Sequence, residues 1–291
     1  MSNILITGAT GHLGKATISA LLNKGVNAVK ISALVRNEKK AQELKEMGIK
    51  ILVADYEDYN SLVKAFACVD QLLFISGSDV MNRNQQQQNV VKAAVEAKVK
   101  HVIYTSALNR LPIEQSAISF VSQAHVKTEQ WLAESGLNYT ILQNSLYADV
   151  IPQFIGDVLN TQTIYLPAAQ GKTAFVVRTD IAEAVAGVLT SDGHNGKTYK
   201  ITNTESYTYQ NVADIISDIT GKSITYISPT VEDFTATLEN AGLPAETIGG
   251  FTAFALAQAN DEFNVTGTDL EVLLNRKPTN LKEYLIDIYA K

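Results

Sequence analysis

Short apolar runs alternate with longer amphipathic segments through the first half of the chain. Six of these runs predict buried β-strands: Ile4–Thr7, Ile31–Val35, Ile49–Ala54, Gln71–Ile75, His101–Thr105 and Tyr139–Leu142. Between them, apolar residues at helical spacing predict helices at about 12–24, 38–47, 59–68, 84–97 and 119–135. Strands that are apolar on both faces and separated by helices indicate a parallel sheet covered on both sides. Because crossovers in such sheets are right-handed, the pattern predicts a doubly wound α/β domain.

After about residue 145 this rhythm loosens. A helical pattern at 181–190, strand patterns at Thr198–Thr202 and 224–227, and helical patterns at 209–220 and 280–290 follow. We therefore predict a first domain over 1–150, with 174–190 packing back onto it. A smaller, interleaved α+β lobe is expected over 151–291, where it shapes a substrate pocket.

The composition is that of an ordinary globular protein, with 46% hydrophobic and 19% charged residues. The net charge of −6 comes without a basic run, so neither nucleic acid nor an anionic membrane is an expected partner. The N-terminus lacks a basic leader region, and no apolar run approaches the roughly 20 residues needed to cross a bilayer. We expect a soluble, cytoplasmic protein. The single cysteine, Cys68, excludes an internal disulfide and is expected to be a small buried residue on a helix.

A glycine-rich turn follows the first predicted strand and opens the first predicted helix. It runs Thr7-Gly8-Ala9-Thr10-Gly11-His12-Leu13-Gly14, with the spacing G-x-x-G-x-x-G that is characteristic of short-chain dehydrogenase-like proteins. Gly8 permits a tight turn, Gly11 a close backbone approach to a pyrophosphate, and Gly14 close packing of helix on strand. The free N–H groups of the helix start then face the anion. The alternative is a glycine-rich turn without a ligand; the context favours a Rossmann-type dinucleotide site.

The end of the second strand indicates which dinucleotide binds. An NAD-specific site places an acidic residue about 20 residues beyond the turn to bind the ribose hydroxyls. Here Arg36 ends the strand, with Lys39 and Lys40 close behind. A guanidinium complements a 2′-phosphate, which a carboxylate would repel. The alternative is an ordinary surface arginine; we favour NADPH over NADH.

Other strand ends belong to the same crevice, because ligands of open α/β sheets bind beyond the carboxyl ends of the strands. Asp55 and Tyr56 follow the third strand and are expected to flank the adenine. Ser76-Gly77-Ser78 follows the fourth and is expected to line the ribose and nicotinamide path. Thr105 and its neighbours end the fifth strand and face the same crevice.

The acid of ordinary short-chain dehydrogenases is missing. Those enzymes carry Tyr-x-x-x-Lys on the helix after the fifth strand, where the cation lowers the pKa of the phenol. Here Lys127 is present, but the residue four positions earlier is Gln123. Lys127 either touches the cofactor ribose or is a solvated helix residue. Without a proton donor, reduction of simple ketones is disfavoured, whereas an acceptor that stabilises its own charge, such as a quinone or a cationic dye, needs none.

These motifs together resemble a known family, the NmrA-like, atypical short-chain dehydrogenases. The segments that carry the resemblance are Thr7–Gly14, Leu34–Asn37, Ala54–Tyr56, Leu72–Gly77, Lys100–Ser106, Leu142–Tyr147 and the C-terminal Asp269–Leu281. Within the family the chain is most similar to bacterial NAD(P)H:quinone oxidoreductases and triphenylmethane-dye reductases. Gln143 stands where those reductases usually show Arg. The resemblance spans nearly the whole chain.

The resemblance implies a set of NADP contacts at the turn, at Arg36 and at the later strand ends. They are Gly8, Ala9, Thr10, Gly11, His12, Leu13, Arg36, Ser76, Gly77, Ser78, Asn144, Ser145, Leu146, Tyr147, Ala148 and Asp149. Asn144 and Tyr147 are then expected near the nicotinamide and the substrate, as catalytic candidates beside Lys127; the alternatives are a capping Asn and a core Tyr. His125 is a weaker candidate, and no spacing suggests a metal site or a flavin.

Three functions remain open from the sequence. The first is an NADPH-dependent reductase that transfers hydride directly to quinones or related electron-poor aromatics. The second is a non-enzymatic redox sensor that binds NADP(H) and acts through a protein partner, as NmrA-like regulators do. The third is an isomerase or reductase of phenolic metabolites. A homodimer is compatible with the sequence, and loop 107–118 is a candidate cover for the crevice.

Overall fold

A parallel sheet of seven strands forms the centre of the computed structural model, which describes residues 2–290. The strands are β1 (Ile4–Ile6), β2 (Ile31–Val35), β3 (Lys50–Val53), β4 (Gln71–Ile75), β5 (His101–Ala107), β6 (Asn138–Asn144) and β8 (Lys197–Ile201). Their spatial order is β3-β2-β1-β4-β5-β6-β8. The order reverses between β1 and β4, and a crevice opens beyond the carboxyl ends at such a switch point.

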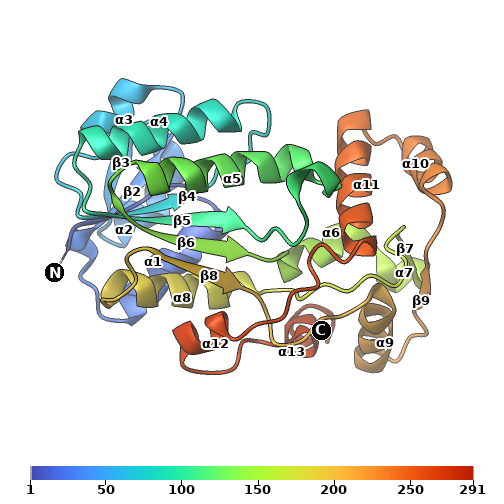
Figure 1. Cartoon of the computed structure of the whole chain (residues 1–291). Coiled ribbons are helices and arrows are strands. Elements are labelled where there is room, and N and C mark those ends of the chain that lie inside the picture. Colours follow the sequence, from blue (N-terminus) through green and yellow to red (C-terminus); the bar gives the residue numbers. More distant parts are fainter. Residues whose placement is uncertain (1, 291) are drawn as a thin grey trace.

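Successive residues of a strand pack into two separate hydrophobic cores, because side chains alternate between the two faces of a sheet. In β1, Ile4 and Ile6 enter one core while Leu5 enters the other. Helices α3 (Tyr59–Ala65), α4 (Arg83–Glu96) and α5 (Ser119–Glu134) cover the Leu5 face. Helices α1 (His12–Asn23), α2 (Gln42–Glu46) and α8 (Arg178–Thr190) cover the opposite face (Figure 1). The predicted doubly wound fold is confirmed.

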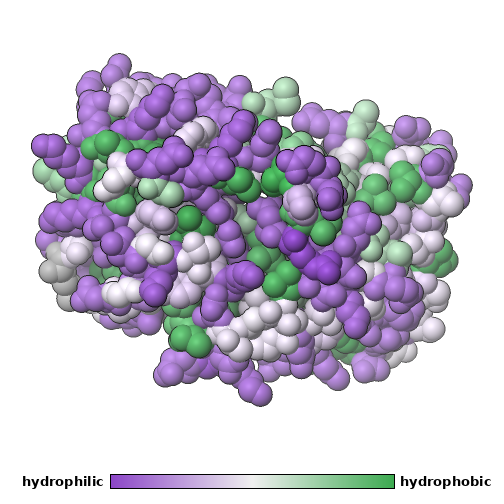
Figure 2. Space-filling view, in the orientation of Figure 1, coloured by the Kyte–Doolittle hydropathy of each residue, from purple (hydrophilic) through white to green (hydrophobic). Residues whose placement is uncertain are grey.

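A lobe beside the carboxyl end of the sheet has its own core. It contains α6 (Ile151–Ile155), α7 (Val158–Thr161), β7 (Thr163–Tyr165), α9 (Tyr209–Thr220), β9 (Thr225–Ile227), α10 (Val231–Asn240), α11 (Ala245–Ala259) and α13 (Leu281–Tyr289). Strands β7 and β9 pair in parallel as a second, small sheet. Hydrophilic side chains cover most of the face seen in Figure 2, and hydrophobic ones show in the furrow between the lobe and the main sheet.

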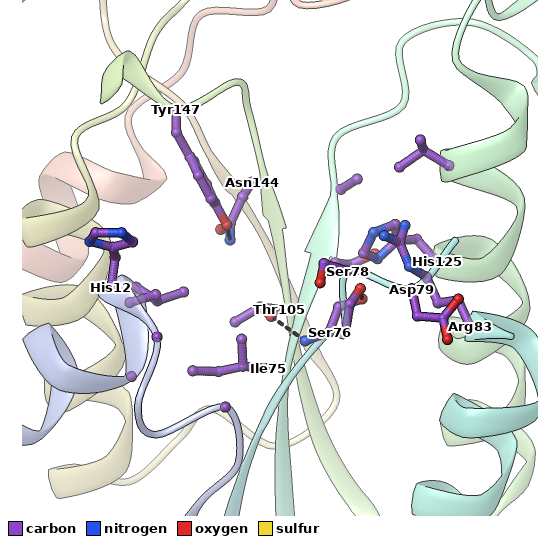
Figure 3. Close-up of a pocket in the computed structure, with 18 of the residues that line it drawn as sticks. His12, Ile75, Ser76, Ser78, Asp79, Arg83, Thr105, His125, Asn144 and Tyr147 are labelled. Atoms are coloured by element: carbon purple, nitrogen blue, oxygen red, sulfur yellow. Dashed lines mark hydrogen bonds between the residues drawn. The ribbon is translucent and has the colours of Figure 1, made fainter. Parts of the chain in front are cut away.

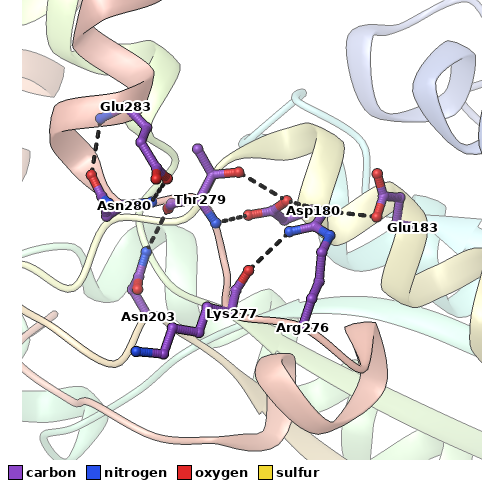
Figure 4. A network of polar contacts seen from close by, with 8 residues as sticks. All are labelled: Asp180, Glu183, Asn203, Arg276, Lys277, Thr279, Asn280 and Glu283. Carbon is purple, nitrogen blue, oxygen red and sulfur yellow. Dashed lines mark hydrogen bonds and ion pairs between the residues drawn. The ribbon is translucent and has the colours of Figure 1, made fainter.

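A buried carboxylate ties the C-terminal segment to α8. Asp180 is 1% exposed and accepts hydrogen bonds from Arg276 at 2.7 Å and from the Thr279 backbone at 2.6 Å (Figure 4). Arg276 lies just beyond α12 (Asp269–Leu274) and also pairs with Glu183 at 2.7 Å. Asn203 donates to the Thr279 carbonyl at 2.9 Å. Since this segment leads directly into α13, the network fixes where the last helix packs in the lobe.

Most predicted elements match the structure to within a few residues, and three differences have a physical reason. Strands β5 and β6 each continue two residues beyond the prediction, because Ser106 and Ala107 pair with Gln143 and Asn144. Strand β8 joins the main sheet beside β6, a pairing between distant segments. The prediction for Cys68 is wrong: α3 ends at Ala65, and Cys68 is exposed with φ +63°.

No helix among residues 2–290 combines the length and the apolar character needed to cross a membrane. The division into domains at residue 150 stays a prediction.

Candidate active site

A cleft of about 720 Å³ lies beyond the carboxyl ends of the main strands, where the strand order reverses. The glycine turn and the ends of β2 and β3 form one stretch of its wall. The ends of β4, β5 and β6 form the next stretch, and side chains of α4, α5 and the lobe complete it. The crevice expected from the sequence pattern is therefore present as a continuous groove.

The glycine turn has the geometry that phosphate binding requires. Gly8 has φ +59°, a conformation that side chains rarely adopt. A Cβ on Gly14 would lie 2.4 Å from the Gly8 carbonyl oxygen and 2.7 Å from the Ala9 Cα, so only glycine fits there. Helix α1 begins at His12 with no side-chain cap and no acidic residue in its first turn. Its N–H groups and helix dipole thus remain available to an anion.

The ends of β2 and β3 supply the second part of the wall. Arg36 lines the cleft, is exposed, and forms no ion pair among residues 2–290. Asp55 and Tyr56 also line the cleft. The Tyr56 hydroxyl donates to the Ile75 carbonyl at 2.8 Å, and burial raises the pKa of this phenol. The hydrogen bond holds the aromatic ring between the ends of β3 and β4.

Hydroxyl groups tie the neighbouring strand ends together under the cleft. Thr7 accepts from the Ile75 backbone N–H at 2.9 Å, and Thr105 accepts from the Ser76 backbone N–H at 3.1 Å (Figure 3). Ser76, Gly77, Ser78 and Thr105 all line the cleft, as expected from their positions after β4 and in β5. Because these bonds link β1 with β4 and β4 with β5, they fix the relative positions of the three strand ends.

At the end of β6, two residues that line the cleft have buried polar atoms without partners among the described residues. Asn144 is 5% exposed and donates to the Tyr147 hydroxyl at 3.0 Å. The Asn144 Oδ1 and Ser145 Oγ atoms are buried and have no hydrogen-bond partner among the described residues. Burial raises the pKa of Tyr147, so its phenol stays protonated at neutral pH. Arg178 packs over the Tyr147 ring, 4.5 Å from its centroid, and also lines the cleft.

An apolar chamber continues the cleft beyond Asn144. Ile118 and Val121 approach from the start of α5, and Phe254 and Phe263 from α11 and the segment after it. Loop 107–118 docks beside this chamber: Glu262 accepts from the Ser116 hydroxyl at 2.6 Å and from the Ala117 N–H at 2.8 Å. The loop therefore begins and ends at the cleft wall, and its role as a cover stays a prediction. No local pattern identified the two phenylalanines, which reach the site only through folding of the lobe.

Four predicted site residues do not line the cleft. Ala9 and Ala148 are fully buried, and the Ala148 N–H donates to the Val176 carbonyl at 2.8 Å. Asp149 forms an ion pair with Arg178 beside the cleft. Lys127 is half-buried on α5, and the structure does not bring it to the wall.

His125 lines the cleft from the same helix. Two residues along a helix turn by about 200°, so Lys127 lies on another face of α5. Arg83, on α4, also lines the cleft. Sequence reasoning missed Arg83 and Arg178, because each lies just before a predicted helix and belongs to no motif. Among residues 2–290, no cluster of three or more His, Cys, Asp or Glu side chains is arranged to hold a metal ion.

Comparisons with known proteins agree with this geometry. The profile of the NmrA-like family matches residues 1–285. The chain belongs to the NmrA-like family.

Several relatives of this NmrA-like protein have names that describe an activity. It is 39% identical over 241 residues to Quinone oxidoreductase 2 of Escherichia coli (strain K12), covering 83% of this chain and 82% of that protein. The crystal structure of an NADPH-dependent quinone oxidoreductase from Escherichia coli, complexed with NADPH, superposes with a TM-score of 0.92 at 34% identity, over 98% and 99% of the two chains. The triphenylmethane reductase of Citrobacter sp., complexed with NADP(H), gives 0.90 at 35% identity, over 99% and 100%.

Proposed function

We propose that this NmrA-like protein is an NADPH-dependent reductase that transfers hydride directly to quinones or related electron-poor aromatic acceptors, without a flavin. The observation that carries the proposal is the continuous cleft, which joins the glycine turn to an apolar chamber near Asn144. Its relatives that are named quinone oxidoreductase and triphenylmethane reductase support the same reaction class.

The residues of the cleft fit NADPH at both of its ends. The N–H groups at the start of α1 would bind the pyrophosphate, and the unpaired Arg36 would bind the 2′-phosphate. The unpartnered Asn144 Oδ1 and Ser145 Oγ would accept from the nicotinamide carboxamide, which removes the cost of leaving them buried and unbonded. When bound, NADPH supplies a hydride to an acceptor in the adjoining chamber.

The chamber suits a flat aromatic acceptor better than a simple ketone. Ile118, Phe254 and Phe263 give it apolar walls, which exclude water and orient a ring. The Tyr-x-x-x-Lys pair is absent, because Gln123 stands at the position of the tyrosine, and Lys127 does not line the cleft. Tyr147 is held by Asn144 and Arg178, with its phenol protonated, and would position the acceptor. The contact predicted for Lys127 stays a prediction.

The test is NADPH oxidation followed at 340 nm with purified protein and benzoquinone, naphthoquinone or a triphenylmethane dye, with NADH alongside. Turnover that prefers NADPH supports the proposal. NADPH binding without consumption of any acceptor would refute it and favour the redox-sensor alternative. An Asn144→Ala variant should lose turnover, and a Lys92→Met variant, changed on the exposed side of α4, should retain it. Cytoplasmic location and a homodimer stay predictions.

A further inference from the structure

A buried arginine in the cleft wall has no partner. Arg83 is 7% exposed on α4, yet its Nε and Nη1 atoms have no hydrogen-bond partner among residues 2–290. A guanidinium remains charged at neutral pH, and an unpaired buried charge is costly. The nearby acid, Asp79, acts on Arg83 through its charge but forms no ion pair with it among residues 2–290, and its Oδ2 accepts from Asn82 and Gln86 at 3.0 and 3.1 Å. Since Arg83 lines the cleft, an anion there would compensate its charge.

Arg83 is separated from the glycine turn, the proposed pyrophosphate site. Figure 3 shows Arg83 and His125 on one side of the cleft, and His12 of the glycine turn with Tyr147 on the other. The cofactor's pyrophosphate, held at the turn, therefore does not account for Arg83. The ends of β4 and β5, with Ser76 and Thr105, lie between the two sides.

His125 lies beside Arg83 and has a fixed orientation. Its Nδ1 is 2.8 Å from the Tyr104 hydroxyl, and the Tyr104 hydroxyl is also 3.3 Å from Gln87 Oε1. In the tautomer in which the Tyr104 hydroxyl donates to Nδ1, the ring proton lies on Nε2. Burial, followed by the charge of Arg83, lowers the pKa of His125 to about 3, so the imidazole is neutral and serves as a hydrogen-bond donor.

We propose that Arg83 and His125 form an oxyanion site for the acceptor's carbonyl oxygen, opposite Asn144 and Tyr147. The proposal rests on the proposed function and specifies its substrate class. A quinone that accepts a hydride from NADPH gains two electrons and one proton, leaving NADP⁺, and becomes a hydroquinone monoanion. The negative charge then lies on the oxygen that Arg83 and His125 bind. One proton from water completes the hydroquinone.

The same site discriminates between acceptors. A cationic triphenylmethane dye gives a neutral product on hydride addition, so no oxyanion forms, and the charge of Arg83 repels the dye. Substituting Arg83→Met should thus lower kcat with 1,4-naphthoquinone about 100-fold, as loss of an oxyanion donor does. Turnover of a cationic dye should be unchanged or increased. An equal loss with both acceptors, together with a raised KM for NADPH, would overturn the proposal and place Arg83 at the cofactor.

A binding measurement tests the oxyanion site independently of turnover. The probe is 2-hydroxy-1,4-naphthoquinone, which is an anion at neutral pH, titrated calorimetrically into the full-length protein with and without NADP⁺. We expect binding to wild type and to Lys92→Met, at least tenfold weaker binding to Arg83→Met, and an intermediate value for Arg83→Lys. Equal binding to all four proteins would overturn the proposal. If wild type binds the probe through Arg83 but reduces no acceptor, the oxyanion site stands and the proposed function fails.

The folding of the variant provides a control. Because Arg83 is buried without a partner, Arg83→Met should raise the temperature of unfolding rather than lower it. Arg83→Lys keeps the cation and supplies a second test if Arg83→Met fails to fold.

Discussion

Adding one methyl group to Gly14 should disable the glycine turn, whereas the same change at Gly187 should stabilise the protein. Both glycines lie inside helices, α1 and α8. A Cβ at Gly14 would meet backbone atoms at 2.4 and 2.7 Å, which cannot move aside as a side chain can. A Cβ at Gly187 would meet only the Leu273 carbonyl oxygen at 3.5 Å, an ordinary contact.

Two opposing contributions to the free energy of unfolding set the expected change in stability. Overpacking against fixed atoms costs about 3 kcal/mol, and alanine returns up to about 1 kcal/mol of helix propensity. Gly14→Ala should therefore lose about 2 kcal/mol of stability, or about 4 °C in Tm for a chain of this size. Gly187→Ala keeps only the propensity gain, about 0.5–1 kcal/mol. If α1 moves away from the turn, loss of one N–H bond to phosphate weakens NADPH binding by about 1.5–3 kcal/mol, or roughly 10- to 100-fold.

Two measurements test this reasoning. Thermal unfolding gives the stability of each variant, and calorimetric titration gives its Kd for NADPH. The reasoning fails if Gly14→Ala retains wild-type affinity and Tm, or if Gly187→Ala loses as much as Gly14→Ala. A loss of affinity at Gly14 with little loss of stability would still support the role of the turn in binding.

Three further predictions concern charge. Arg36→Ala should raise the KM for NADPH about tenfold and leave the KM for NADH unchanged, because Arg36 is exposed and unpaired. The increase should be smaller at high salt. Equal effects on the KM of both cofactors would contradict the role of Arg36. Asp180→Asn should lower the free energy of unfolding by about 2–3 kcal/mol in urea titration, since Arg276 and Thr279 lose a buried carboxylate; an unchanged midpoint would refute this. Burial lowers the folded-state pKa of His125 to about 3, so the unfolded chain alone binds that proton below pH 6.5. The free energy of unfolding should thus fall by about 1.4 kcal/mol per pH unit as the pH drops from 6.5 towards 3. Urea titrations at several pH values should show a smaller slope for His125→Gln. An unchanged slope in this variant would contradict the lowered pKa of His125.

The fold was predictable because its signals are local and repeated. Apolar runs such as His101–Thr105 are buried on both faces of the sheet. Because helices separate these runs in the sequence, a parallel sheet with helices packed on each face is the arrangement that buries them. The exposed position of Cys68 was not predictable, because where α3 ends depends on how its last turn packs against the sheet. Strand β8 was predicted as a strand, but its place beside β6 is a pairing of distant segments.

The sequence by itself determined the glycine turn and the arginine at the cleft rim. Gly8, Gly14 and Arg36 act through their own backbone geometry or charge, at positions that the first two strands fix. Only the tertiary structure brought together Arg83 and His125, because helix rotation and the packing of α4 against α5 decide which polar side chains face the cleft. The walls of the chamber likewise come from residues more than 100 positions apart, whose contact depends on where the lobe docks.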